Sequence, residues 1–591
     1  MGSLASLIIN QNSQRLIIRD LLQKRSVKVL FVILVALTIF RFWLGNRLGV
    51  WYIPHASLDD ALFVSFADFR THFRNDTLTS LVKTMPYGAF LRAVSLSNIP
   101  YATVITLLWI LVSLLMVVLF SSVTTNPFWL AFTYLYVLFT PTAFEMLIGT
   151  RLLRNSIFPP FFYLTFALML LLVIGVLRWP QKRGALVATA VALGVVFTFS
   201  YYLNEAGFWL TPILLLCLLA CLGIHLYRCR LTSKLDDGTR QKVAWRLPAI
   251  GFLCIPLLIF GLGAVAYRTI NYYFFGVWEI ETRQSAELGR FVQNVYRIQS
   301  DNRTALVWAP QDAIAAAFAA SPTLTSLPLA TLDLIGEPQG DFLTWNLRNA
   351  LWGAGVWTTN REMNELFGQV NAEIDSAFMA GILQQDDRFQ LTASAGGRTT
   401  DEIIGLLPAT FGTFVEYLTL SDFTPGPLHS YTWDEYSLVR AAHLTNTPLF
   451  TEAARYDELL AGSWEITSAI TNGIFMFYRV INVVLALLAI IGILGALDLA
   501  WATARRIGWR ATLAVGGSAT TTLWLAALAI FFISIVYAFG ISWFNEFIPG
   551  GNQFYALGAV PMISIVLLVG TYCVFFVLRQ LRAVYQGSRL S

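Results

Sequence analysis

Charged residues are scarce in this sequence. Only 13% of its 591 residues are Asp, Glu, Lys or Arg, whereas a soluble globular domain has about 25%. Hydrophobic residues make up 56% of the chain. This composition excludes an ordinary soluble fold and predicts an α-helical polytopic membrane protein that crosses the membrane many times.

Cysteine is also scarce, and the common motifs of soluble enzymes are missing. All five cysteines lie in or next to apolar runs, so no disulfide framework is indicated. No Cys/His spacing typical of a zinc site occurs. No P-loop, serine-hydrolase elbow, zinc-protease motif or protein-kinase motif set occurs. The basic stretches suit membrane lipids better than nucleic acid, so no nucleic-acid partner is expected.

About ten apolar runs approach the roughly 20 residues that a membrane-spanning helix needs. They are 29–46, 99–121, 127–144, 158–177, 185–203, 208–227, 248–270, 472–500, 511–540 and 554–578. The predicted inner segments hold 20 Lys and Arg residues, whereas the three short outer loops hold only two. The positive-inside rule therefore predicts that both termini are cytoplasmic and that the first run is a retained signal anchor.

The chain is predicted to divide into four segments. These are a basic cytoplasmic N-terminus at 1–28, a membrane module of about seven helices at 29–270 with a first outer loop at 47–98, an extracytoplasmic acidic domain at 271–470, and a C-terminal membrane segment of about three helices with a basic cytoplasmic tail at 471–591. The acidic domain has ten Arg, no Lys and 24 Asp and Glu, a formal charge of −14. Apolar residues at helical spacing over 361–373 favour a mainly helical domain, α or α+β.

The remaining acidic residues gather in the predicted outer loops. Outside 271–470 there are 11 acidic residues, and seven of them lie in four outer loops. These seven are Asp59, Asp60, Asp68, Asp76, Glu145, Glu205 and Glu546. The four loops can converge at one mouth of the helix bundle. The adjacent carboxylates Asp59 and Asp60, which follow the first span, predict a catalytic site at that mouth.

The pair Asp59 and Asp60 suits the transfer of a group to a hydroxyl. One carboxylate can deprotonate the acceptor hydroxyl, which contributes about 10²- to 10⁴-fold to the rate. The other can orient it, bind sugar hydroxyls or hold a divalent metal such as Mg or Mn. We favour Asp59 as the base and Asp60 as the residue that orients it. The alternative is a solvated acidic loop with no catalytic role.

Three basic residues in the outer loops are candidates for binding a phosphate. Lys83 lies in the segment 77–93, which is expected to form an interfacial helix. Arg151 and Arg154 break the positive-inside pattern, and helical spacing would place both on one face. Arginine suits fork-like contact with phosphate. Snorkelling at the membrane interface, or pairing with Glu145, is the alternative for these side chains.

Glu205 is the only charged residue in a tight predicted turn between two spans. Charged groups near membrane depth are costly and tend to be functional, so Glu205 is a candidate substrate-binding residue, with a helix cap as the alternative. Glu145, Tyr87 and Trp209 are the other candidate substrate-binding residues on the predicted outer side.

These features, in this order, resemble the GT-C superfamily of integral-membrane glycosyltransferases. They are most similar to bacterial glucosyltransferase-like membrane proteins that have a late extracytoplasmic domain. The matching positions are Asp59, Asp60 and Leu62; Lys83 and Pro86; Arg151, Arg154, Ser156 and Pro159; and Glu205, Trp209 and Pro212. The sequence departs from the pattern at Asn204, where a basic residue is common, at Thr84, where glycine is common, and in having a single acid in the turn.

The resemblance implies an inverting transferase whose active site lies on the extracytoplasmic face of the inner or plasma membrane. It implies a polyprenyl-phosphate-sugar donor of a hexose and a glycan acceptor, either a cell-wall or a lipid-linked saccharide. Lys83, Arg151 and Arg154 would neutralise the leaving phosphate, and an aspartate would take the acceptor proton. Two alternatives are a transporter or flippase of lipid-linked saccharide, which predicts charges within spans and inverted repeats, and a non-catalytic envelope-assembly protein.

Overall fold

The computed structural model describes residues 25–53, 59–178, 182–232, 248–328, 335–426, 430, 435–452, 455, 458, 462–507, 519–544 and 552–588. Helices dominate these residues, and no strand forms among them. Most of the predicted basic N-terminus, much of the inner loop 228–247, and Glu546 lie outside the described residues.

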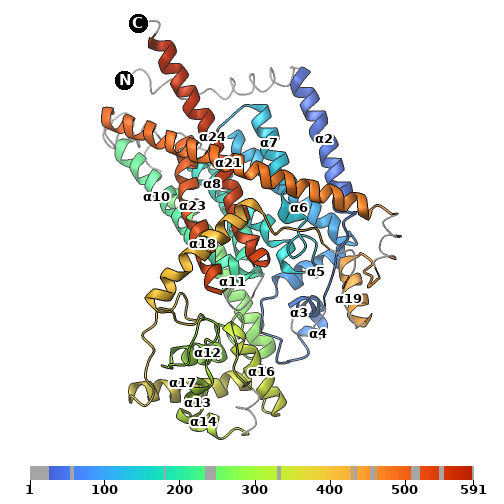
Figure 1. Cartoon of the computed structure of the whole chain (residues 1–591), viewed down its shortest axis with the longest axis vertical. Helices are drawn as coiled ribbons and strands as arrows, with labels where there is room; N and C mark the ends of the chain where they lie inside the picture. Colours follow the sequence, from blue (N-terminus) through green and yellow to red (C-terminus); the bar gives the residue numbers. More distant parts are fainter. Residues whose placement is uncertain are drawn as a thin grey trace.

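Nine helices in the described part of the chain are long and apolar enough to cross a membrane. They are α2 (Arg25–Gly45), α6 (Tyr101–Ser121), α8 (Phe158–Arg178), α9 (Arg183–Leu203), α10 (Leu210–Thr232), α11 (Pro248–Phe275), α21 (Trp464–Ile507), α23 (Ala519–Phe544) and α24 (Asn552–Ser588). Each overlaps a predicted apolar run, and together they form the upper part of Figure 1. The prediction of a helical, multi-pass membrane protein is therefore confirmed.

The predicted run 127–144 does not form a long helix. It contains α7 (Pro127–Leu138), a helix of 12 residues, and then the short 3-10 helix η1 (Pro141–Ala143). Because an α-helix rises 1.5 Å per residue, α7 covers about 18 Å of a hydrocarbon core of about 30 Å. The residue before a proline is disfavoured in the α region, so Pro141 accounts for the end of this helix.

The chain nevertheless returns across the bundle between α6 and α8. Tyr101 at the start of α6 contacts the Ser156 hydroxyl just before α8. Arg178 at the end of α8 donates to the Ser122 carbonyl at the end of α6. α6 and α8 therefore run in the same direction, and α7 with residues 139–157 carries the chain back. The start of α2 and the end of α24 lie at the same end of the bundle, at the top of Figure 1.

A second, smaller core lies at the other end of the molecule (Figure 1). It is built by α12 (Glu287–Arg297), α13 (Gln311–Ala320), α14 (Pro322–Thr325), α16 (Leu343–Gly353) and α17 (Asn360–Met379). Phe291 of α12 and Phe367 of α17 pack with ring centroids 5.3 Å apart. Burying a large apolar side chain contributes about 1.5–3 kcal/mol, which accounts for the pairing of these two helices. The helix predicted over 361–373 is confirmed by α17.

The predicted acidic segment 271–470 divides between the two cores. α18 (Thr400–Thr419) packs against α21, α23 and α24, while α19 (Glu435–Thr445) packs against α5 (Pro86–Ser97). Tyr417 of α18 and Ala441 and Leu444 of α19 belong to the core of the bundle, whereas Leu406, in the first half of α18, packs in the second core. The sequence pattern concealed this because α18 begins with two acidic residues and contains a proline, so its apolar residues form no run long enough to span a membrane.

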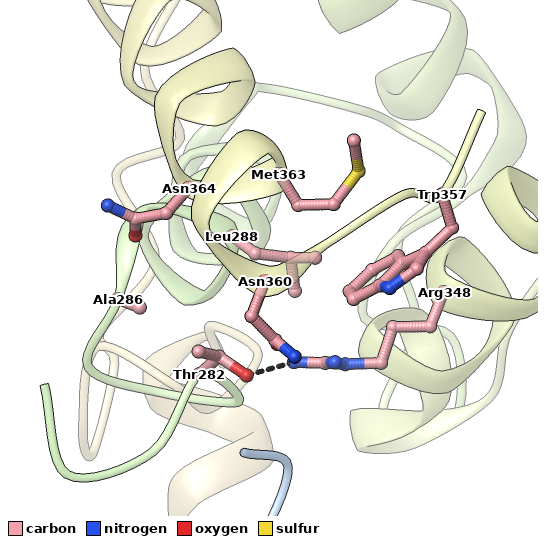
Figure 2. A pocket seen from close by; sticks show the side chains of 8 residues that line it. All are labelled: Thr282, Ala286, Leu288, Arg348, Trp357, Asn360, Met363 and Asn364. Atoms are coloured by element: carbon pink, nitrogen blue, oxygen red, sulfur yellow. Dashed lines mark hydrogen bonds between the residues drawn. The ribbon is translucent and has the colours of Figure 1, made fainter. Parts of the chain in front are cut away.

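The second core holds the loop that precedes Lys83. Thr282 donates to the Leu81 carbonyl from its backbone N–H at 2.7 Å and from its hydroxyl at 3.1 Å. Arg348 donates to the Leu78 carbonyl at 2.5 Å and to the Thr282 hydroxyl, a contact drawn in Figure 2. An interfacial helix was predicted over 77–93, but the helix α5 begins only at Pro86. The prediction is therefore wrong for the loop that contains Lys83.

Asn360, at the start of α17, forms further hydrogen bonds with the same loop. Its backbone N–H donates to Asp76 Oδ2 at 2.9 Å, and its side-chain amide donates to the Thr77 carbonyl at 3.0 Å. Figure 2 shows Asn360 and Arg348 reaching the same side of a small hollow, with Trp357 beside the arginine. The second core therefore fixes the position of the chain from which Lys83 projects.

Replacing Arg348 with Met is expected to destabilise the protein by about 1–3 kcal/mol, the cost of leaving a buried polar group without its partner. Arg348 is fully buried, and its removal leaves the Leu78 carbonyl without this donor. Thermal unfolding of the purified full-length protein in detergent measures the change. Arg361→Met is the matched control, because Arg361 is exposed and pairs with Glu365 at the surface, where such pairs contribute about 0–1 kcal/mol. Equal Tm values for the two variants would contradict the prediction.

Candidate active site

Asp59 and Asp60 are the first two residues of helix α3 (Asp59–Ala67). Acidic residues in a first turn are favoured by the positive end of the helix dipole. α3 buries Phe63 and packs against α5, which fixes the direction of its first turn. The two carboxylates have different surroundings: Asp60 is fully buried, whereas 22% of the Asp59 side chain is exposed.

Asp60 is held by Arg151 in a two-pronged ion pair. Arg151 Nε donates to Asp60 Oδ1 at 2.9 Å, and Nη2 donates to Oδ2 at 2.5 Å. The guanidinium lies 5.4 Å from the centroid of the Trp51 ring, and the Trp51 backbone pairs with Thr150 and Leu152 on either side of Arg151. Burial raises the pKa of Asp60, and Arg151 lowers it by a smaller amount. Both carboxylate oxygens are therefore occupied.

Asp59 belongs to a separate cluster of charges. Lys83 Nζ lies 3.2 Å from Asp59 Oδ2 and 2.9 Å from Glu205 Oε1. Arg154 Nη2 lies 3.4 Å from Asp59 Oδ2 and 2.5 Å from Glu205 Oε2. The four residues come from α3, the loop before α5, and two short 3-10 helices, η2 (Arg154–Ser156) and η3 (Glu205–Trp209). The structure thus brings four of the predicted site residues together from four segments.

Arg283, from the segment that leads into the second core, completes this cluster. Its Nη1 lies 3.4 Å from Glu205 Oε1, and its Nη2 contacts Asp341 Oδ2. We call Lys83, Arg154 and Arg283 the cation site. The sequence analysis missed Arg283 because it is one of ten arginines in an acidic segment. The one available signal was its place shortly after α11, where the chain leaves the bundle.

The cation site controls the charge of Asp59. Burial raises the pKa of Asp59, but Lys83 and Arg154 outweigh it and hold that pKa below its usual range. Burial lowers the pKa of Lys83, although Asp59 and Glu205 oppose the change. Asp59 is therefore ionised at neutral pH. Lys83 and Arg154 both contact its Oδ2.

The cluster opens on one side. The side chains of Lys83 and Arg154 are only 7% and 5% exposed, whereas that of Glu205 is 42% exposed. Two nearly buried cations thus lie behind a carboxylate that reaches the surface. An anion arriving from outside meets Glu205 first and the cations behind it.

Tyr87 and Trp209 do not bond to the charge cluster among the described residues. The Tyr87 hydroxyl lies 2.9 Å from the Tyr101 hydroxyl, which in turn contacts Ser156 of η2. The Trp209 ring packs against Tyr537 with centroids 5.6 Å apart. Tyr87 is therefore linked through Tyr101 to η2, the turn that carries Arg154. Trp209 packs η3 against α23.

Glu145 turns back onto its own loop. Its Oε2 accepts from the backbone N–H groups of Leu147 at 2.6 Å and Ile148 at 2.8 Å. Its Oε1 is buried without a hydrogen-bond partner in the described part of the chain. Burial raises the pKa of Glu145 to about 8, against the opposing effect of these N–H groups and of Arg151. Glu145 forms no ion pair with an arginine among the described residues, and it lies apart from the cation site.

Glu145 is expected to make stability depend on pH. Its folded-state pKa of about 8 is above the ordinary value of 4.5, so the folded protein holds the proton more tightly than the unfolded chain. Stability is therefore highest below the ordinary pKa and falls as the pH rises toward 8. Glu145→Gln should flatten this part of the Tm profile, while the exposed control Glu365→Gln should leave it unchanged. Parallel profiles for wild type and Glu145→Gln would contradict the prediction.

The carboxylates of the cluster do not fit a divalent metal ion. Both oxygens of Asp60 bind Arg151, and Oδ2 of Asp59 faces two cations. Glu205 contacts all three members of the cation site. No group of three or more His, Cys, Asp or Glu among the described residues is placed to hold a metal. The site is an ion-pair network, and the Mg or Mn cofactor stays a prediction.

No family model, curated protein or solved structure matches this chain. The resemblance to GT-C glycosyltransferases therefore depends on the motifs alone and stays a prediction.

Proposed function

We propose that this protein is a membrane glycosyltransferase. It moves a hexose from a polyprenyl-phosphate-sugar donor to a hydroxyl of a cell-wall or lipid-linked glycan on the extracytoplasmic face of the inner or plasma membrane. The observation that carries the proposal is the contact of the part-exposed carboxylate of Asp59 with two members of the cation site, Lys83 and Arg154.

The cation site suits the leaving group of this reaction. The phosphate gains negative charge as its bond to the sugar breaks, and preorganised cations stabilise such developing charge. Lys83 and Arg154 are nearly buried, and charges interact more strongly where water is excluded. Arg151 is committed to Asp60, so Lys83, Arg154 and Arg283 replace the predicted set of Lys83, Arg151 and Arg154 as phosphate ligands.

Asp59 suits the role of general base. The acceptor oxygen attacks the anomeric carbon, Asp59 takes the hydroxyl proton, and the bond from that carbon to the phosphate oxygen breaks with inversion. Lys83 and Arg154 hold the pKa of Asp59 below its usual range in this structure. When the donor phosphate neutralises these cations, Asp59 becomes a stronger base, so proton transfer is favoured only in the loaded site.

Asp60 and Arg151 act as positioning residues in this scheme. Their ion pair joins the first turn of α3 to the segment just before η2. It thereby fixes Asp59, the residue before Asp60, relative to Arg154, which comes shortly after Arg151. Because both oxygens of Asp60 are occupied and the residue is buried, it is poorly suited to accept a proton.

The transporter alternative has less support. Arg41 in α2 and Arg479 in α21 are charges within candidate spans. Arg41 donates to the Leu138 carbonyl, and Arg479 donates to the carbonyls of Leu420 and Ser421. Each of these arginines therefore satisfies carbonyls at the end of a helix, which is a structural role.

A transfer assay tests the proposal. Purified full-length protein is given polyprenyl-phosphate-linked hexoses and an envelope-glycan extract, and labelled hexose in the glycan is measured. We expect transfer by the wild-type protein with at least one donor. Movement of the lipid-linked sugar across vesicles without transfer would favour the transporter, and neither activity would favour the assembly protein.

A further inference from the structure

Glu205 lies where a bound phosphate is expected. Its Oε1 is 2.9 Å from Lys83 Nζ and 3.4 Å from Arg283 Nη1, while its Oε2 is 2.5 Å from Arg154 Nη2. One carboxylate therefore contacts three cations from three segments. Arginine and lysine groups converging on a single anion are typical of phosphate recognition.

The carboxylate of Glu205 can leave this position without unfolding its surroundings. Among the described residues its carboxylate forms ion pairs with the cation site alone, and 42% of the side chain is exposed. The turn that carries it is fixed separately, because Asn204 Oδ1 accepts from the Ala206 N–H at 2.9 Å and the Asn204 amide donates to Asn155 at 3.2 Å. Rotation of the Glu205 side chain alone therefore exposes the cations.

The cations of the cation site need an anionic partner. Lys83 and Arg154 are nearly buried, and a buried charge without a partner is costly. Asp59 forms ion pairs with both of these cations, whereas among the described residues Arg283 acts on Asp59 through its charge and not through an ion pair. Glu205 is the carboxylate that contacts Lys83, Arg154 and Arg283. Arg283 contacts Glu205 through Nη1 and Asp341 through Nη2.

We propose that Glu205 is an internal substitute for the substrate phosphate. Its carboxylate fills the cation site when no donor is present, and a phosphate group on a lipid or in solution displaces it to bind Lys83, Arg154 and Arg283. This inference rests on the proposed function and deepens it. Glu205 competes with the ligand instead of binding the sugar, and Arg283 brings the second core into the phosphate site.

Phosphate binding without transfer tests this inference. Farnesyl phosphate and inorganic phosphate are titrated separately into full-length protein in detergent, and the affinity is measured by calorimetry. Glu205→Gln removes the competing charge and should raise the affinity about tenfold, whereas Arg283→Gln should lower it about tenfold, since a hydrogen bond to a charged group contributes about 1.5–3 kcal/mol. The matched controls are Glu365→Gln and Arg290→Gln, which change surface-paired residues.

The two variants give independent answers. Equal or weaker binding by Glu205→Gln would overturn the displacement, and wild-type affinity in Arg283→Gln would remove Arg283 from the phosphate site. If Glu205→Gln does not fold, Glu205→Asp takes its place: its shorter side chain reaches the cations less well, so this variant should also bind phosphate more tightly than the wild type, and equal or weaker binding would overturn the displacement. Tighter binding of farnesyl phosphate than of inorganic phosphate identifies a lipid-borne ligand, and equal binding identifies a free one. Because no acceptor is present, failure of hexose transfer would overturn the proposed function without changing these affinities.

Discussion

Replacing Asp59 with Asn is expected to lower the rate of hexose transfer by about 10²- to 10⁴-fold, the usual contribution of a general base. Asparagine has nearly the same shape as aspartate but does not accept a proton from the acceptor hydroxyl. Glu205 still contacts Lys83 and Arg154, so the cations keep a partner and the fold is expected to persist. The initial rate at saturating donor, with the affinity for farnesyl phosphate measured separately, checks this result.

The loss should appear in kcat, because the base acts in the transition state and not in donor binding. Asp68→Asn is the matched control. Asp68 lies in the same segment between α2 and α6, is part-exposed, and caps the short helix α4 (Phe69–His72). Asparagine caps helices as well as aspartate does, so this variant should keep both its Tm and its rate. Near wild-type transfer by a folded Asp59→Asn protein would eliminate Asp59 as the base.

The membrane helices were predictable because long apolar runs have few other uses. The sequence could not show that the run 127–144 stops as a helix at Leu138, since hydropathy continues past the proline that ends it. Nor could it show that α18 joins the bundle, because contacts with α21, α23 and α24 offset the polar residues of its first turn. In both cases tertiary packing decided what composition left open.

The candidate site was predictable to the extent that it depended on sidedness. Counting charges by predicted side singled out Asp59, Lys83, Arg154 and Glu205, and these four meet in the structure. Counting charges does not indicate which partner each charge takes, so the pairing of Asp60 with Arg151 and the isolation of Glu145 were not foreseen.

Arg283 shows a second limit of the sequence. It reaches the cluster from the segment beyond α11, and no motif marks it. Its role depends on how the second core sits against the loop before Lys83, through contacts of Thr282 and Arg348 with that loop. Contacts of this kind between distant segments produce no periodic pattern or motif spacing in the sequence. They could therefore be found only in the three-dimensional structure.

Replacing Asp60 with Asn is expected to destabilise the protein by about 3–5 kcal/mol, because removing one partner leaves the charge of the other buried and uncompensated. Asp60 is fully buried, and the side chain of Arg151 is only 7% exposed. Thermal unfolding of the full-length protein in detergent measures the change. Asp76→Asn is a suitable control, since it also changes an aspartate held by hydrogen bonds but leaves no buried arginine unpaired.

A second substitution separates the contribution of Asp60 to the stability of the protein from its role in hexose transfer. Adding Arg151→Met to Asp60→Asn removes the uncompensated charge, and replacing both members of a buried ion pair is often nearly neutral for stability. We therefore expect the double variant to recover most of the lost Tm, a coupling that a double-mutant cycle measures. If Asp60 only positions Asp59, the recovered protein should transfer hexose faster than Asp59→Asn. A stable double variant with no more transfer than Asp59→Asn would instead place Asp60 in the proton-transfer step.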